Sequence, residues 1–169
     1  MRMAVHDFAA VYDEHVLAVH GFLAYRLQSR SDAEDLTQQT FERAFRAWGR
    51  YDPARASVGT WLLAIARNLL VDHLRAARPD HRTPLEEVEL EALPGAPDTY
   101  GLGIDPDLER ALRQLSERER EIVALRFGGD LSGPEIAALT GLTLANVQQI
   151  ISRSLRRMRR SIDGARAAA

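Results

Sequence analysis

The 169-residue sequence contains no cysteine, no lysine and no long hydrophobic run. The lack of cysteine excludes disulfides, cysteine-ligated zinc, iron–sulfur clusters and thiol catalysis. No apolar run approaches the roughly 18 residues that are needed to cross a bilayer. The first residues, MRMAVHDF, lack the apolar core of a signal peptide. These absences predict a soluble, cytoplasmic protein with no membrane insertion.

Recognisable catalytic and metal-binding patterns are missing as well. The five histidines show no metal-ligand spacing, because His15 and His20 would diverge on a helix. The sequence contains no glycine-rich phosphate loop, no serine nucleophile elbow and no pattern of paired catalytic carboxylates. We therefore predict a protein that is not an enzyme and that binds no metal or other cofactor.

Charge is distributed unevenly along the chain, although the net charge is only −2. Residues 1–78 hold 10 arginines against 9 acidic residues, residues 79–107 hold 1 against 8, and residues 108–169 hold 11 against 7. The acidic segment is also rich in proline and glycine, a composition that sustains neither a long helix nor a buried core. We predict two small domains, at 1–78 and 108–169, joined by a flexible acidic linker at 79–107.

Elsewhere, apolar residues recur at the three- and four-residue spacing of an α-helix. This periodicity predicts helices near 8–23, 33–48, 60–76, 107–115, 117–127, 133–139 and 144–162. No alternating strand pattern is visible, so the predicted fold class is all-α. The Ser-x-x-Glu pattern of a capping box begins at Ser31, Ser116 and Ser132, and it predicts a helix start at each.

Residues 132–160 have the layout of a helix-turn-helix. Gly141 permits a sharp turn after a short apolar helix, and Thr143 can cap the helix that follows. The apolar stripe expected on this second helix is Leu144, Val147, Ile151, Leu155, Met158 and Ile162. Asparagine, glutamine and arginine side chains on the other side can pair with base edges or phosphates, although a solvated arginine face has the same pattern. Ile150 lies outside the stripe, so it contacts either a thymine methyl group or a neighbouring protein.

Two polar faces occur in the first half of the chain. On the helix near 33–48, a continuous polar stripe either docks another helix or faces solvent. On the helix near 60–76, a narrow polar strip interrupts an otherwise apolar surface beside a loop that contains Arg55 and Ser57. Nearby aromatic residues (Trp48, Tyr51 and Trp61) either stack on bases or belong to the core. Together these features are typical of a single-stranded nucleic-acid surface.

Taken in their order along the chain, these helices and polar faces resemble the extracytoplasmic-function (ECF) sigma factors of bacterial RNA polymerase. The resemblance extends over about residues 5–163. The segment DAEDLTQQTFERAF (32–45) looks like the second conserved region of that family, and TWLLAIARNLLVDHLR (60–75) is similar to its TWL-x-x-IARN signature. The segment LSEREREIVALRF (115–127), followed by the helix-turn-helix, is similar to the fourth region. One departure is the Gln148-Gln149-Ile150 run, where many relatives carry Lys-Ser-Arg, and it indicates a different −35 preference.

The resemblance implies a promoter-specificity subunit that binds core RNA polymerase, recognises −10 and −35 elements, and opens DNA to initiate transcription. The residues implied to dock the clamp helices of the largest subunit are Asp35, Gln38, Gln39 and Glu42. Those implied to open and read the −10 element are Tyr51, Arg55, Ser57, Thr60, Trp61, Arg67, Asn68, Asp72 and Arg75. Those implied to read the −35 element are Thr143, Asn146, Gln148, Gln149, Arg153, Arg156, Arg157 and Arg160. Other implied contacts are the polymerase flap, promoter DNA and an anti-sigma factor that masks these surfaces.

Two other functions stay open. A stand-alone helix-turn-helix regulator would use residues 108–169 but would leave the two polar faces of the first half without a role. An adaptor of the sigma and anti-sigma system would use its helices only for protein contacts. Because sequence-independent affinity comes from neutralised phosphates, we expect this near-neutral chain to bind promoters weakly until polymerase presents both domains together.

Overall fold

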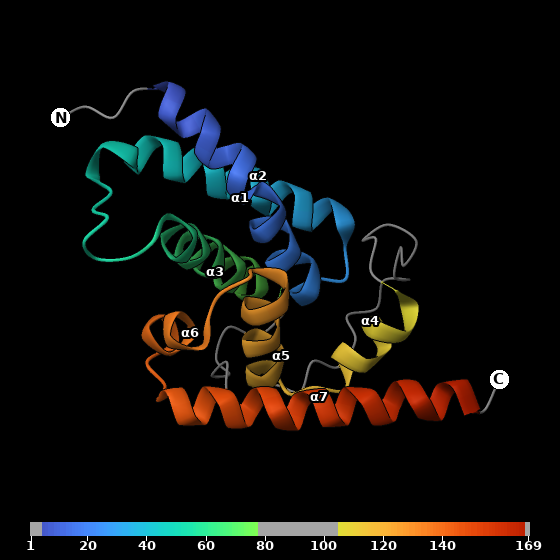
Figure 1. Cartoon of the computed structure of the whole chain (residues 1–169). Helices are drawn as coiled ribbons and strands as arrows, with labels where there is room; N and C mark the ends of the chain where they lie inside the picture. The colour runs from blue at the N-terminus through green and yellow to red at the C-terminus, as the bar shows by residue number, and fades with distance from the viewer. Residues whose placement is uncertain (1–4, 78–104, 168–169) are drawn as a thin grey trace.

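Helices account for every regular element in the part of the chain that the structure describes. This computed structural model describes residues 5–77 and 105–167, and it confirms the all-α fold class (Figure 1). The acidic linker predicted at 79–107 lies outside these ranges up to residue 104. The division into two domains stays a prediction.

The first half contains three long helices, α1 (Val5–Arg26), α2 (Arg30–Ala47) and α3 (Val58–Ala76), and a short 3-10 helix η1 (Trp48–Arg50). Their apolar faces meet in a core that includes Phe22 and Leu23 of α1, Phe41 of α2 and Leu62 of α3. Aromatic rings close one end of this core, where Phe8 packs edge-to-face on Phe41 at 6.4 Å between ring centroids. The predicted apolar periodicity therefore corresponds to a real three-helix core.

The second half contains α4 (Pro106–Arg113), α5 (Glu117–Val123), the π-helical turn η2 (Ala124–Gly128), α6 (Gly133–Thr140) and α7 (Leu144–Ala167). The long helix α7 runs beneath α4, α5 and α6 along one edge of the molecule (Figure 1). The sequence predicted the long helix at 117–127 without its π-helical end. The π-helical turn ends at Gly128, and Gly129 follows it as the C-cap.

Two of the three predicted capping boxes are confirmed, at Ser116 and Ser132. The third is wrong, because α2 begins at Arg30 and is capped by Ser29, whose hydroxyl accepts a hydrogen bond from the backbone N–H of Asp32 at 3.2 Å. Ser31 lies inside the first helical turn. The side chain of Glu34 accepts a bond from Arg30, its partner one turn away, at 2.6 Å, and so does not close a box.

The apolar stripe predicted on α7 is correct only in part. Val147 and Met158 are buried, but Leu144 and Leu155 are 40% and 43% exposed. The helix instead turns Ser154, which is fully buried, toward the interior, and Ile150 packs against the main core. Because α5 and α6 cover α7 on this side, Ile150 has a packing role within the chain.

The two halves are packed against each other in one continuous core. Ile122, Leu125, Ile136 and Val147 of the second half belong to the same buried cluster as the helices of the first half. Backbones approach closely at Gly21 of α1 and Gly128 of η2, where a Cβ added to Gly128 would lie 2.6 Å from the carbonyl oxygen of Gly21. Two bare backbones therefore touch where the halves meet.

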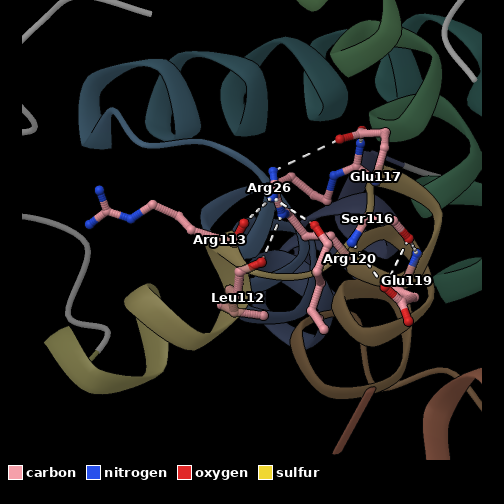
Figure 2. A network of polar contacts seen from close by, with 8 residues as sticks. Arg26, Leu112, Arg113, Ser116, Glu117, Glu119 and Arg120 are labelled. Carbon is pink, nitrogen blue, oxygen red and sulfur yellow. Dashed lines mark hydrogen bonds and ion pairs between the residues drawn. The ribbon is translucent and has the colours of Figure 1, made fainter. Parts of the chain in front are cut away.

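A largely buried polar network also lies at the junction of the two halves. Arg120 of α5 donates to the backbone carbonyls of Leu112, Arg113 and Leu115 at 3.1–3.2 Å and so satisfies the end of α4 (Figure 2). Arg26 of α1 donates to Glu117 of α5, which forms an ion pair between the two halves. Burial lowers the pKa of Arg26 to about 10, and the nearby charge of Glu121 opposes that shift.

Candidate nucleic-acid interface

The helix-turn-helix predicted at residues 132–160 is present as α6, a tight turn and α7. Ser132 caps α6, and Pro134 occupies its first turn, where no backbone N–H donor is required. Gly141 adopts the left-handed conformation with φ of 73°, which a residue with a side chain rarely adopts. Thr143 then accepts from the backbone N–H of Asn146 at 3.2 Å and so caps α7. Local sequence therefore fixes both ends of the turn.

The residues that the sequence assigned to −35 recognition all have exposed side chains. We call this surface the α7 face, and it comprises Thr143, Asn146, Gln148, Gln149, Arg153, Arg156, Arg157 and Arg160. Within the face, Arg157 also pairs with Glu119 of α5 at 2.8 Å. The amides lie toward the start of α7 and the arginines toward its middle, so groups suited to base edges precede groups suited to phosphates along the helix.

The four residues assigned to polymerase docking also share an exposed face, on α2. This α2 stripe comprises Asp35, Gln38, Gln39 and Glu42. Within it, the side-chain amide of Gln38 donates to Glu42 at 2.9 Å. The stripe is arranged as the helical spacing predicts, and its members point away from the core.

A groove that the sequence did not predict borders the α2 stripe. It has a volume of about 840 Å³ between α1 and α2, and its apolar lining includes Tyr12, Leu17 and Phe45. These three side chains are 44%, 82% and 49% exposed. The sequence signal was present in the helical periodicity, but periodicity does not distinguish an apolar side chain in the core from one that lines a groove. The stripe and the groove together form a mixed polar and apolar surface.

The residues assigned to −10 recognition lie on the loop before α3 and along α3 itself. We call the polar residues among them the α3 strip, which comprises Ser57, Thr60, Arg67, Asn68, Asp72 and Arg75. Ser57 caps α3 by accepting from the backbone N–H of Thr60 at 3.3 Å, so the helix begins at Val58, two residues earlier than predicted. Asn68, Asp72 and Arg75 are exposed, whereas Thr60 is buried.

The aromatic residues near this loop form one stack. The rings of Trp48 and Tyr51 are parallel, with 5.3 Å between their centroids, and Tyr51 lies 5.0 Å from Trp61. Trp48 is buried in the core, while Tyr51 and Trp61 are half-buried. Of the two readings that the sequence left open, core packing therefore applies to Trp48. Tyr51 and Trp61 keep partly open ring surfaces.

A pocket of about 380 Å³ lies against these open surfaces. Its lining includes four of the residues assigned to −10 recognition, namely Tyr51, Arg55, Thr60 and Trp61. Ala138 and Leu139 of α6 complete the lining from the second half of the chain. The pocket therefore lies at the junction of the two halves.

Two carboxylates of the second half reach the α3 strip. Glu135 of α6 accepts hydrogen bonds from the hydroxyls of Ser57 and Thr60 at 3.0 and 3.1 Å. Glu121 of α5 accepts from the guanidinium of Arg67 at 2.6 Å. Sequence reasoning missed both contacts. It assigned Glu135 only to a capping box, and nothing in the local pattern of α5 marks Glu121.

Glu135 serves two purposes at once. One of its carboxylate oxygens accepts from the backbone N–H and the hydroxyl of Ser132, which completes the cap of α6, while the other accepts from Ser57 and Thr60. The hydrogen bonds from Ser132 and, to a smaller extent, those from Ser57 and Thr60 lower the pKa of Glu135 below its ordinary value. The group is therefore held in its charged form mainly by the cap of α6, with a smaller contribution from the contacts that join the halves.

None of the described helices combines the length and the apolarity that a membrane span requires. Within residues 5–77 and 105–167, no group of three or more potential metal-ligating side chains comes together.

Comparison with known proteins gives two matched regions. Residues 11–79 match the family model of sigma-70 region 2, and residues 106–158 match that of sigma-70 region 4. The ECF RNA polymerase sigma factor RpoE of Cereibacter sphaeroides is 34% identical over 154 residues, which cover 90% of this chain and 84% of that protein. The ECF sigma factor BldN of Streptomyces coelicolor is 32% identical over 157 residues, covering 90% of this chain but 59% of BldN.

A solved structure has a similar fold. The sigma factor RpoE of Bartonella quintana, crystallised with the anti-sigma factor NepR, aligns with a TM-score of 0.72 and 23% sequence identity. The alignment covers 94% of this chain and 98% of that one. At this level of identity the likeness concerns the arrangement of helices.

Proposed function

The chain belongs to the ECF sigma factors of RNA polymerase, and we propose that three of its surfaces divide the work of promoter recognition. The α2 stripe binds the clamp helices of the polymerase largest subunit. The loop before α3, together with the α3 strip, reads the −10 element as a single strand. The α7 face reads the −35 element as a duplex.

The observation that carries this proposal is that sigma-70 region 2 and region 4 are matched in that order on one chain. A stand-alone regulator needs only the second region, and an adaptor needs no base-reading side chains. Asparagine and glutamine near the start of α7 suit adenine, and arginine suits guanine or phosphate. The exposed residues of the α7 face therefore support duplex recognition.

The pocket beside Tyr51 and Trp61 supports the single-strand part of the proposal. Removing a base from the stack costs a few kcal/mol, and half-buried aromatic rings recover part of that cost by stacking on the base. Arg55 lines the same pocket and supplies a positive charge for the neighbouring phosphate. A base that leaves the duplex thus meets stacking and electrostatic partners together.

Two further assignments follow from the proposed role. A sigma factor acts where the polymerase and chromosome are, so we place the protein in the bacterial cytoplasm. The RpoE structure from B. quintana contains an anti-sigma factor, and we propose that this chain also has an anti-sigma partner. The polymerase flap is a further proposed contact, with the second half of the chain.

Transcription by a reconstituted holoenzyme tests the function. Purified chain and core polymerase are incubated with genomic DNA of the source organism, and transcript 5′ ends are mapped. We expect start sites that share −10 and −35 sequences and that are absent with core polymerase alone. Sequence-specific DNA binding without any start site would instead identify a stand-alone regulator.

Variants of the α7 face separate a promoter reader from an adaptor. Arg153→Ala and Arg156→Ala remove side chains proposed to contact DNA, and each should reduce −35-dependent transcription. Loss of a phosphate contact should also lower the salt dependence of promoter binding by about one unit of slope. If both variants transcribe like the original chain, the proposed −35 assignment is wrong.

A further inference from the structure

We propose that Tyr51 and Asp52 are positioning residues, which hold the loop at residues 51–57 in the conformation that receives the −10 strand before DNA binds. We call these residues, which join η1 to α3 (Figure 1), the −10 loop. The inference rests on the proposed function, because it takes this loop as part of the −10 reader. It deepens that function by naming groups that act on the loop itself instead of on DNA.

The hydroxyl of Tyr51 closes the −10 loop from one end to the other. It donates to the backbone carbonyl oxygen of Ala56 at 2.9 Å, five residues along the chain. The backbone N–H of Tyr51 donates to the carbonyl oxygen of Trp48 at 3.1 Å, which fixes the same residue to η1. Burial and the nearby charge of Asp52 raise the pKa of Tyr51, so the hydroxyl keeps the hydrogen that it donates.

The ring of Tyr51 is itself held in place by the neighbouring aromatic side chains. It lies parallel to the ring of Trp48, with 5.3 Å between the centroids, and its centroid is 5.0 Å from that of Trp61. Trp48 is buried in the core, so this anchor does not move with the loop. A ring that is fixed by stacking presents its hydroxyl at a defined point. The bond to Ala56 therefore constrains the loop.

A β-turn shapes the outer part of the −10 loop. The backbone N–H of Arg55 donates to the carbonyl oxygen of Asp52 at 3.1 Å, and the carboxylate of Asp52 accepts from the backbone N–H of Ala54 at 3.0 Å. Pro53 is the second residue of the turn, and its ring fixes φ near the value that the common turn types require there. Aspartate is favoured at the first position for its bond to the backbone. Sequence and hydrogen bonds therefore select one conformation.

These contacts leave the proposed DNA-binding groups of the loop open. Arg55 is exposed at the end of the turn, and it lines the pocket together with the half-buried rings of Tyr51 and Trp61. The four hydrogen bonds all lie within residues 48–56, so they do not depend on the second half of the chain. Ordering a loop during binding costs conformational entropy, and a loop that is ordered in advance avoids that cost. Tyr51 and Asp52 therefore raise the affinity for the strand through the loop.

Amide hydrogen exchange of the full chain measures the order of the −10 loop. Tyr51→Phe keeps the ring and its stack on Trp48 but removes the hydroxyl. We expect exchange at Ala54 and Arg55 to become about fivefold faster, which corresponds to the loss of one neutral hydrogen bond. Tyr25→Phe is the matched control, because it removes a hydroxyl from α1, and it should leave exchange in the loop unchanged. Unchanged exchange in Tyr51→Phe would overturn the proposal.

Two variants of Asp52 test the turn in the same measurement. Asp52→Ala removes the side-chain acceptor of the Ala54 N–H, and it should also accelerate exchange about fivefold. Asp52→Asn removes the charge but keeps a side-chain oxygen that accepts the same bond, so exchange should stay close to that of the original chain. Equal acceleration in both variants would show that the hydrogen bond does not hold the turn, and the role of Asp52 would be wrong.

Binding to two DNA probes separates positioning from a merely structural role. Holoenzyme is assembled with each variant, and anisotropy measures its binding to the labelled non-template strand of a −10 element from the mapped start sites. We expect about fivefold weaker binding for Tyr51→Phe and for Asp52→Ala. A labelled duplex that carries only the −35 element should be bound as by the original chain. Equal losses on both probes, or full binding to the −10 strand despite faster exchange, would overturn the proposal.

The failure of this inference differs from the failure of the proposed function. The exchange measurements use neither polymerase nor a promoter, so they test the order of the loop alone. Absence of start sites with the original chain would overturn the proposed function and the inference that rests on it. Start sites with the original chain, together with undiminished −10 binding by Tyr51→Phe, would overturn the positioning role and leave the proposed function intact.

Discussion

The charged side chain of Arg26 is buried at the junction between the two halves. Only 8% of the residue is exposed, and its Nε and Nη1 atoms have no hydrogen-bond partner, although it donates to Glu117. A buried ion pair of this kind contributes little net stability, but removal of one partner leaves an uncompensated charge. The two partners should therefore differ in how much their loss costs.

We predict that Glu117→Ala is more destabilising than Arg26→Met. Loss of Glu117 strands the buried guanidinium and should lower the free energy of unfolding by about 3 kcal/mol. Arg26→Met removes the buried charge together with its unpaired N–H groups, and Glu117 keeps access to solvent and to Arg120, 3.9 Å away. Urea denaturation of both variants measures the difference. A larger loss for Arg26→Met would contradict this account.

Ser154 is a second buried residue with a polar atom that lacks a hydrogen-bond partner. It is fully buried on α7, and its hydroxyl has no hydrogen-bond partner. We predict that Ser154→Ala raises the free energy of unfolding by about 0.5–1 kcal/mol, through helix propensity and removal of an unpaired polar group. Ser152→Ala, at an exposed position of the same helix, controls for propensity. Thermal denaturation should show the larger gain for Ser154→Ala.

At the scale of single elements, the start of α2 tests how local signals compete. Ser29→Ala removes the observed cap and should cost about 1 kcal/mol of stability. Ser31→Ala removes only the contact between the two serine hydroxyls, 2.9 Å apart, and should change stability by less than about 0.5 kcal/mol. Chemical denaturation compares the two. Equal losses of stability in the two variants would contradict the assignment of Ser29 as the cap of α2.

The helices themselves were predictable because each depends on neighbours in sequence. Periodicity located the seven α-helices of the described residues, and the boxes at Ser116 and Ser132 fixed two of their starts. Periodicity did not predict which side of a helix is buried where several neighbouring positions fit the same helical face. Ser154 and Leu155 are adjacent on α7, and the serine is buried while the leucine is exposed, because the helices that pack on α7 decide which side faces inward. The π-helical end of α5 likewise reflects packing against α1 and Leu63.

At the scale of the whole molecule, the packing of the two halves could not be derived from sequence pattern. The residues assigned to the α2 stripe and the α7 face are exposed as the helical spacing indicated. The contacts of Glu121 and Glu135 join positions 54 or more residues apart, and no local rule connects them. Gly21 and Gly128 are equally remote in sequence. Their contact depends on the way α1 crosses η2.

The contribution of Glu135 to the stability of the folded chain should weaken in acid. Because the pKa of Glu135 is lowered from 4.5, its contribution is fully present above that value and is lost as pH falls through the lower pKa of the folded chain. We predict that the stability difference between the original chain and Glu135→Gln is constant near neutral pH and shrinks as the pH falls below 4.5. Other carboxylates titrate in both proteins and cancel in this difference. A difference independent of pH would exclude a role for the Glu135 charge.

The contact between Gly21 and Gly128 should make the junction intolerant of small displacements at this point. No side chain lies between the two backbones, so nothing can rotate or repack to follow them as they part. A gap of about 0.5–1 Å already forfeits a quarter to a half of the attraction between touching atoms. Partly separated forms consequently lose much of the attraction at this site, and no side chain can restore it.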